Sequence, residues 1–488
     1  MYHGECMLRD LRWVSVAEIF SRLASIVTVP LLTRALVPAE YGIYRAVFFA
    51  LSVFFLVYGI ASFETLLAKR LPEIERPEQA GLIAATALGL AALLGAAWLL
   101  LAVAVRLSLV AVVSPPLQSF LRANGLLVAG LFLALPLFRL VLAVCRGIDR
   151  FGRYSATKLV REGSFLAAVV WLFATGGLTV QTALLAMLGA TGGALLVGVA
   201  SVRTHLLAPP DVAALGEQFR AVSLPLVPKT VLKKVSGVVP DMVVLGAFGP
   251  PVFAAWSVLF AFNSAFQLVS GPFSQLLLPK ISERRADGRA LDPVVTRYYR
   301  LMGVVVAPAV VGGWLLGPEI VRQVFGASYF YGPAVTGVLI TSIGVQTVNA
   351  LSGDFFVGTG KSVYDTYSNG LYAAVLLGAV AAGGLVGSLL VVVVGHLLAN
   401  ATSLAFSLWY QRSVVDLAPP SAVSLLQLAG SLLAMAGVVV AAEGLIGGIP
   451  TVLGVVCLGA VTYFATLHLL GFVSEDDVSL VRRFVGIS

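Results

Sequence analysis

The sequence predicts an all-α polytopic membrane protein of about fourteen transmembrane helices. The 488-residue chain is 59% hydrophobic and 11% charged, whereas a soluble domain carries roughly 25% charged residues. Apolar stretches of about 20 residues, long enough to cross a bilayer as helices, follow one another with short polar breaks. The ten-residue alternation of an outer-membrane barrel is absent from the sequence. These observations exclude a soluble protein and a membrane barrel.

Each predicted span is an apolar stretch that ends at a short polar break. In chain order the spans are Trp13–Leu36, Tyr41–Leu66, Gly81–Val105, Gly125–Cys145, Ala156–Gly176, Thr182–Val202, Phe219–Phe248, Val252–Leu278, Tyr298–Leu316, Ala334–Val357, Thr366–Gly384, Val386–Tyr410, Ala422–Leu445 and Thr451–Phe472. The even number of spans places both termini on one side of the membrane.

Basic residues indicate which side that is. Alternate loops, at residues 69–76, 146–161, 203–220 and 280–289, hold fourteen of them, whereas the intervening loops have only Arg34, Arg106, Arg122 and Arg322 in or beside them. Because Lys and Arg accumulate in cytoplasmic loops, we expect both termini in the cytoplasm and a cell-membrane location. The net charge of +8 is then mostly a topological bias that attracts anionic lipid headgroups, and it does not indicate nucleic-acid binding.

An internal repeat suggests how the helices are grouped. At an offset of 212 residues the first two spans match spans seven and eight, with the pairs Pro38/Pro250, Tyr41/Phe253, Tyr44/Trp256, Phe48/Phe260 and Phe54/Phe266. The seventh span begins six spans after the first, and this even number preserves the orientation, so we expect two six-helix bundles related by a pseudo-twofold axis along the membrane normal. The predicted domains are residues 1–205, 206–415 and a final helix pair with a short cytoplasmic tail at 416–488.

The repeat also points to a central site. It aligns Arg22 with Lys234, and Pro30 lies close to the equivalent of Pro240. Helices interrupted at corresponding positions in two halves often flank a transporter's binding site, because freed backbone groups need protein or water around them. We therefore expect the first and seventh spans to line a cavity.

Three lysines in the seventh span are the first candidates for binding. Lys229 and Lys233 are four residues apart and share a helical face, while Lys234 is turned by about 100°. A cation at the bilayer centre costs roughly 2.5–3.5 kcal/mol, so these residues favour a cavity that receives a pyrophosphate or an acidic sugar. The alternative is that the lysines extend to the cytoplasmic headgroups.

Two arginines in the first two spans extend the candidate site. Arg22 follows Glu18 by one turn, and it either binds substrate or forms an intrahelical ion pair with Glu18. Arg45 lies one turn into the second span and either binds substrate or anchors the outer headgroups. Arg139 precedes Arg146 by seven residues, and extension to the cytoplasm is the favoured interpretation for it.

Buried acids could couple transport to an ion gradient, since a carboxylate is the usual proton or sodium site. The candidates are Glu18, Glu64, Asp241 and Asp354. Ion pairs at the cytoplasmic end explain Glu64 and Asp354 more simply. His396 stands alone in its span, so a satisfied or interfacial histidine is the favoured interpretation there. We expect no metal and no cofactor other than a coupling H⁺ or Na⁺.

Two regions of the sequence resemble a known family. The first comprises Arg22–Ala24, Val29–Tyr44 and Lys69–Glu73; the second comprises Leu277–Ser282, Leu315–Ile320 and Val324–Gly326. These motifs resemble those of polysaccharide biosynthesis transporters, the lipid-linked oligosaccharide flippases of the multidrug/oligosaccharidyl-lipid/polysaccharide exporter superfamily. The resemblance implies a monomer with two bundles that open alternately to either side of the membrane. It also implies that the protein moves the headgroup of an isoprenoid-linked glycan and works alongside glycan-assembly enzymes.

Three functions follow, in decreasing order of support. The first is a flippase for an anionic isoprenoid-(di)phosphate-linked oligosaccharide. The second is an ion-coupled multidrug or cation exporter of the same superfamily, which should offer carboxylates instead of cations to its cargo. The third is a membrane glycan polymerase or ligase, which the short predicted outer connections, residues 106–124 and 317–333, disfavour.

Overall fold

The computed structural model describes residues 2–57, 66–67, 71–74, 78–90, 92, 115–206, 208–220, 224–416 and 421–472. All regular structure in these residues is helical, as the composition predicted. Ten of the described helical segments are long and apolar enough to cross a membrane. The third predicted span lies largely outside the described residues.

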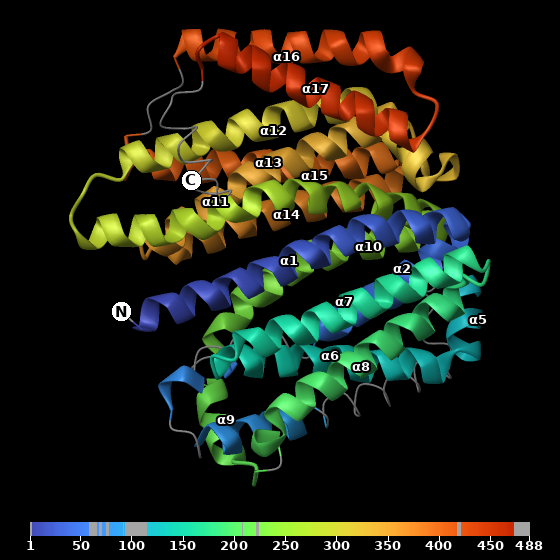
Figure 1. The fold of residues 1–488 in the computed structure, drawn as a ribbon, viewed down its shortest axis with the longest axis vertical. Coiled ribbons are helices and arrows are strands. Elements are labelled where there is room, and N and C mark those ends of the chain that lie inside the picture. The colour runs from blue at the N-terminus through green and yellow to red at the C-terminus, as the bar shows by residue number, and fades with distance from the viewer. Residues whose placement is uncertain are drawn as a thin grey trace. The chain divides into compact units, whose positions relative to one another are not determined.

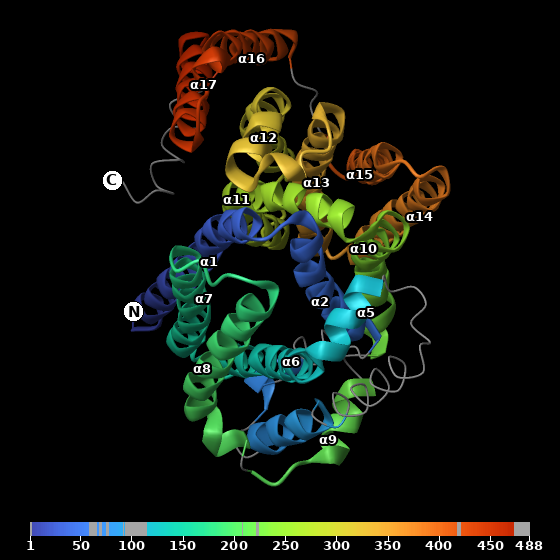
Figure 2. The same ribbon diagram turned by 90° about the vertical axis from the view of Figure 1, so that its right-hand side faces the viewer.

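The chain forms two compact units, Met1–Ser257 and Val258–Ser488. The elements of the first are α1 (Tyr2–Ala35), α2 (Pro38–Val57), η1 (Leu71–Glu73), α5 (Pro115–Ala123), α6 (Gly125–Gly147), α7 (Phe151–Ala174), α8 (Val180–Leu206), α9 (Val212–Gln218) and α10 (Leu224–Leu259), whose last two residues belong to the second unit. Residues 78–90 are also helical. In this unit α7 packs on both α1 and α8, and α6 packs on α8 (Figures 1 and 2).

The elements of the second unit are α11 (Ala261–Ala286), α12 (Asp292–Ile320), η3 (Val321–Phe325), η4 (Ala327–Tyr329), α13 (Pro333–Gly358), α14 (Ser362–Val386), α15 (Leu389–Gln411), α16 (Ala422–Ala442), η5 (Glu443–Leu445) and α17 (Ile449–Leu469). Helix α13 packs on α11, α12 and α15, and α14 packs on α15. The final pair, α16 and α17, lies side by side in both views and packs on α12 (Figures 1 and 2). The proposed domain limits at residues 205 and 415 stay predictions.

The final helix pair is held to α12 by a buried apolar cluster with one polar anchor. Met435 of α16 and Leu467 of α17 pack in the cluster that includes Val304 of α12. The fully buried Tyr463 donates its hydroxyl hydrogen to the Val304 carbonyl over 2.8 Å. This bond satisfies the phenol group inside an otherwise apolar contact.

The break between the seventh and eighth predicted spans occurs at Gly249. This glycine has φ 79° and ψ 177° inside α10, a conformation that favours residues without a Cβ. Pro250 and Pro251 follow it and restart the helix, because their fixed φ suits a first helical turn. In contrast, Pro30 and Pro240 lie within continuous helix, so the expected interruptions at these two prolines do not occur.

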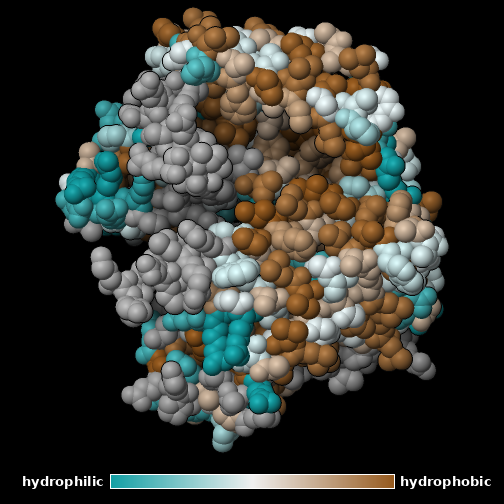
Figure 3. All heavy atoms as spheres, in the orientation of Figure 1, coloured by the Kyte–Doolittle hydropathy of each residue, from teal (hydrophilic) through white to brown (hydrophobic). Residues whose placement is uncertain are grey.

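Many large apolar side chains are exposed on the helices. Brown, apolar spheres cover α16 and α17 in Figure 3, where Leu426, Leu433 and Leu469 are exposed. Exposed apolar side chains also occur on α7 and α8, at Trp171 and Leu196. Helices with such surfaces satisfy their backbone groups internally and can face lipid. The distribution therefore agrees with a multi-pass membrane protein.

Candidate functional site: a cationic cavity in the first unit

A cavity of about 330 Å³ lies within the first unit between α2, α6, α7 and α10. Its charged lining residues are Arg45, Arg139, Arg161 and Asp241. Three guanidinium groups and one carboxylate give this lining a net formal charge of +2. The remaining walls are mainly aromatic and aliphatic, and consist of Phe48, Phe49, Leu51, Ser52, Leu135, Phe138 and Phe253.

Helical spacing explains why these residues meet. Arg45, Phe48, Phe49 and Ser52 are separated by three, one and three residues, which places them on one face of α2. The α6 residues Leu135, Phe138 and Arg139 repeat the same spacing. Each helix therefore presents one arginine together with phenylalanine to the cavity.

Close packing of α2 against α10 fixes the position of Arg45. A Cβ at Gly42 would lie 2.1 Å from the Pro250 carbonyl oxygen, so the two backbones approach at this glycine. Tyr41 and Tyr44 are buried on the same helix, and their rings stack with centroids 5.9 Å apart. Arg45 follows directly, and its buried Nε has no hydrogen-bond partner among the described residues. Arg45 thus reaches the cavity lining from a helix whose position is fixed by close contact.

Asp241 is oriented by a tryptophan on the other side of the Gly249 break. The Trp256 Nε1–H donates to Asp241 Oδ1 over 2.7 Å, and Trp256 is 1% exposed. Phe253, one turn before Trp256, lines the cavity and contacts Phe49 edge-on, with ring centroids 6.0 Å apart. The carboxylate therefore has a fixed place in the wall of the cavity.

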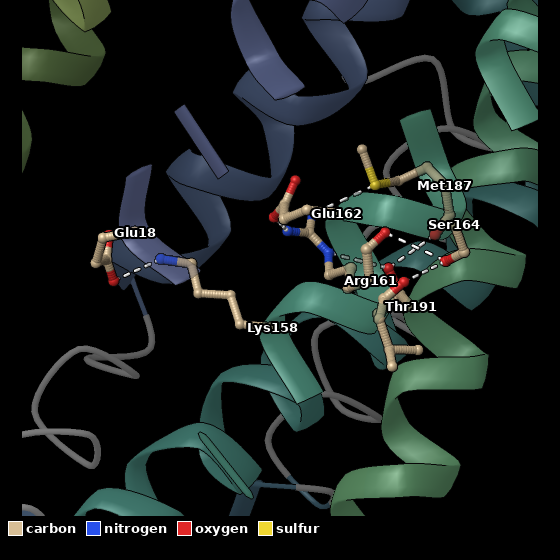
Figure 4. Close-up of polar contacts among 8 residues, drawn as sticks. Glu18, Lys158, Arg161, Glu162, Ser164, Met187 and Thr191 are labelled. Carbon is tan, nitrogen blue, oxygen red and sulfur yellow. Dashed lines mark hydrogen bonds and ion pairs between the residues drawn. The ribbon is translucent and has the colours of Figure 1, made fainter. Parts of the chain in front are cut away.

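Arg161 is held by several partners within α6, α7 and α8. Its Nη1 forms an ion pair with Glu162, its Nε donates to Thr191 Oγ1 over 3.4 Å, and its Nη2 approaches Met187 Sδ at 3.3 Å (Figure 4). The guanidinium carbon also lies 5.1 Å from the centroid of the Phe138 ring. A charged group held this way needs little reorganisation to receive an anion.

A second ion pair joins α1 to α7 beside this arrangement. Lys158 Nζ donates to Glu18 Oε1 over 2.6 Å, and the Tyr154 hydroxyl donates to the same oxygen over 3.1 Å. Figure 4 shows the Glu18 and Lys158 side chains pointing toward each other. Glu18 is thus paired across helices, in addition to being one turn from Arg22 on α1. The pair links α1 mechanically to the helix that carries Arg161.

The predicted site residues therefore lie in different parts of the structure. Arg45 and Asp241 share the cavity, whereas Arg22 of α1 does not line it. Asp354 belongs to α13 in the second unit. Lys229, Lys233 and Lys234 lie on the α10 backbone, but their side chains, like the whole of Glu64, fall outside the described part of the chain. For all of these residues the functional role remains a prediction.

Sequence reasoning did not select Arg139 and Arg161. Arg139 lines the cavity from α6, and its expected extension to the cytoplasm stays a prediction. Arg161 was grouped with the cytoplasmic loop cations, but α7 begins at Phe151 and carries Arg161 on its third turn. The available signal was the occurrence of each arginine inside an apolar predicted span.

A separate apolar groove occurs in the second unit. It has a volume of about 550 Å³ and is lined by residues of α11, α12, α13, α16 and α17. Phe266, Met302 and Phe464 are among its walls, and its few polar residues include Ser270 and Thr347. Such a surface suits a hydrocarbon chain and offers little to a charged group.

Comparison with known proteins shows which fold this is. No protein-family model and no curated protein matches the sequence. The lipid II flippase MurJ in an inward closed conformation superposes with a TM-score of 0.74 at 13% identity, covering 97% of this chain and 99% of MurJ. An inward-facing multidrug resistance MATE transporter of the MOP superfamily gives a TM-score of 0.63 at 12% identity, covering 83% and 98%. The chain has the fold of the multidrug/oligosaccharidyl-lipid/polysaccharide exporter superfamily.

These solved structures cover different shares of this chain. MurJ matches this chain along almost its whole length, while the MATE transporter leaves about a sixth of it unmatched. A Pyrococcus furiosus transporter of the same superfamily, described as having a binding pocket of reversed polarity, gives a TM-score of 0.57 at 12% identity, covering 83% of this chain and 95% of its own. All three neighbours with this fold are flippases or transporters.

Proposed function

We propose that this protein is a flippase that moves an anionic isoprenoid-(di)phosphate-linked oligosaccharide from the cytoplasmic to the outer leaflet. The observation that carries the proposal is the cavity with Arg45, Arg139 and Arg161, whose net charge favours an anion. Guanidinium groups bind phosphate oxygens through paired, charge-assisted hydrogen bonds. Such a site would lower the cost of taking a diphosphate through the membrane.

In this proposal the isoprenoid chain lies in the apolar groove of the second unit. Burial of each CH₂ group contributes roughly 0.8 kcal/mol, so a groove lined by α12, α16 and α17 can retain a long hydrocarbon. The α16 and α17 walls belong to the predicted helix pair that follows the two six-helix bundles. A tail in an apolar groove and a headgroup in a cationic cavity are the two requirements of a lipid-linked saccharide.

Export of a cationic drug is the alternative within the same fold. A cation would be repelled by the three arginines of the lining, of which Arg161 is paired with Glu162, and attracted by the carboxylate of Asp241. The sign of the lining charge therefore favours the flippase. Polymerase or ligase chemistry is the weakest option, because the neighbours of this fold are transporters.

The proposal includes a working arrangement in the cell. The protein would lie in the cell membrane with both termini in the cytoplasm, act as a monomer beside glycan-assembly enzymes, and cycle by alternating access. The basic loops support this orientation through the positive-inside rule. The glycan would serve assembly of a cell-surface polysaccharide or glycoprotein.

The decisive experiment replaces Arg45 and Arg161 with alanine, singly and together. Hydrogen bonds to charged groups contribute about 1.5–3 kcal/mol each, so each change should weaken headgroup binding by about tenfold to more than a hundredfold. Flipping would be followed in proteoliposomes with undecaprenyl diphosphate that carries a fluorescent saccharide. Arg289→Ala is the matched control, since Arg289 is exposed and pairs with Asp287 at the surface.

Unchanged flipping by the Arg45→Ala/Arg161→Ala double variant at normal protein levels would refute the cationic site. The lysine prediction is tested separately with the double variant Lys229→Ala/Lys233→Ala, scored by glycan display in a strain that lacks its own flippase. We expect loss of display. Full display would remove these two lysines from the site and leave the three arginines as its cations.

A further inference from the structure

One face of α15 carries a continuous series of buried polar residues. His396, Asn400, Ser403, Ser407 and Gln411 recur every three or four residues, and each is at most 4% exposed. The series extends from His396 to the last residue of the helix, about 22 Å along the axis at about 1.5 Å per residue. An apolar span needs no such face, and every buried polar group in it requires a partner.

At one end of this face the His396 ring is hydrogen-bonded through both nitrogens. Its Nδ1 lies 2.6 Å from Ser342 Oγ and 3.2 Å from the Asn400 amide nitrogen, while Nε2 lies 3.2 Å from the Tyr372 hydroxyl. The same amide nitrogen also lies 3.1 Å from Ser342 Oγ and 3.0 Å from the His396 carbonyl oxygen, so its two hydrogens have three acceptors. In the neutral Nε2–H tautomer, Nε2 donates to the Tyr372 hydroxyl and Nδ1 accepts from the Ser342 hydroxyl, which leaves a basic nitrogen enclosed by groups that can reorient.

Further along α15 two more polar clusters continue the series. Ser403 and Ser407 both contact Ser368 Oγ of α14, at 2.7 and 2.8 Å. At the end of the helix, Gln411 Oε1 accepts from the Tyr299 hydroxyl over 3.1 Å. The Gln411 amide nitrogen is buried and has no hydrogen-bond partner among the described residues. The last cluster thus retains donor capacity for a mobile group.

Uncharged polar and aromatic groups meet the ring. They include Ser342 of α13, Tyr372 of α14, Asn400 of α15 and Phe260, whose ring meets it edge-on with centroids 5.6 Å apart. The nearest acids along the contacting helices are Asp365, about 10 Å from Tyr372 along α14, and Asp354, about 18 Å from Ser342 along α13. Helix α15 itself contains no charged residue.

We propose that His396 binds and releases a proton during the transport cycle, and that the polar face of α15 conducts this proton toward Gln411. On protonation the Nδ1 lone pair forms an N–H bond, Ser342 Oγ becomes its acceptor, and the Asn400 amide turns to present its oxygen. Within a cluster each hydroxyl accepts one hydrogen and passes on another, so none keeps a charge. In the part of the chain that the structure describes, no hydrogen bond joins the side chains of Asn400 and Ser403 or of Ser407 and Gln411, so water must carry the proton across these two steps. Structural bonding between helices would explain the serines, but it requires neither an imidazole nor an unpaired buried donor.

The direct test observes the ring itself. The chain has four histidines, so replacing His3, His205 and His468 with glutamine leaves one ¹⁵N-labelled imidazole in the full-length protein in lipid nanodiscs. We expect its NMR signals to change from the neutral Nε2–H tautomer to imidazolium on acidification while circular dichroism shows intact helices. A ring that stays neutral until the helices unfold would overturn the proposal.

A second measurement asks whether the proton is coupled to transport. In proteoliposomes with the fluorescent undecaprenyl diphosphate saccharide, an imposed pH gradient should change the wild-type flipping rate, and His396→Gln should abolish this response. His468→Gln, on an exposed position of α17, is the matched control. The same gradient response in His396→Gln as in wild type would refute coupling. Failure of the wild type to move the probe would count against the proposed cargo, and the NMR titration would still decide the proton site.

Discussion

Gly42 permits the closest backbone approach near the cationic cavity, and Gly42→Ala should destabilise the protein. The new Cβ would lie 2.1 Å from the Pro250 carbonyl oxygen, whereas ordinary contact begins near 3.4 Å, so α2 and α10 would have to separate by about 1.3 Å at this point. The obstacle is backbone, which has no rotamer to change. Overpacking of this kind costs roughly 1–3 kcal/mol, and we expect the upper part of that range.

The matched control is Gly193→Ala on α8, where an added Cβ meets nothing within 4 Å. Thermal unfolding of both variants in nanodiscs would be compared with wild type. For a unit of this size, each kcal/mol shifts the melting temperature by roughly 2–4 °C, so Gly42→Ala should melt about 4–12 °C lower. The control should melt near wild type. Equal melting temperatures for Gly42→Ala and Gly193→Ala would refute the close contact between α2 and α10.

Two further predictions concern the polar contacts around the cavity. Glu18→Gln removes the carboxylate partner of Lys158 and should raise the accessibility of a spin label or cysteine probe on α1. Lys158→Met removes the other partner and should raise the probe's accessibility equally. A difference between the two variants would contradict the shared ion pair. Trp256→Phe removes the donor to Asp241 and leaves a buried carboxylate oxygen without its partner, which should cost about 1–3 kcal/mol in unfolding experiments. Unchanged stability of Trp256→Phe would show that the bond contributes nothing.

The sequence was sufficient for the fold class because membrane insertion imposes a strong constraint on composition. Long apolar stretches can satisfy their backbone only as helices, so hydropathy alone located α13, α15 and α17 to within a few residues. The boundary between the seventh and eighth spans was also accessible. Gly249 followed by Pro250 ends one helix and starts another through local backbone preferences.

The candidate site was less accessible because hydropathy does not show which face of a helix meets a neighbour. Arg45 and Asp241 were selected as isolated charges, but their common cavity depends on the approach of α2 to α10. Arg139 and Arg161 were assigned to the cytoplasmic side because basic residues follow or precede them in sequence. The polar face of α15 was not predicted because serines hardly lower the mean hydropathy of a long apolar window. The partners of His396 could not be predicted either, because they come from α13 and α14.

Helix α7 carries two cationic side chains with different surroundings within one helical turn. Lys158 reaches Glu18 on α1, and Arg161, three residues later, faces the cavity. A helix rotates as a rigid cylinder, so a turn of α7 that carries Lys158 away from Glu18 sweeps the guanidinium of Arg161 through the same angle. Rotation of α7 would therefore change the contact with α1 and the direction of the Arg161 guanidinium together, so neither can be set independently of the other.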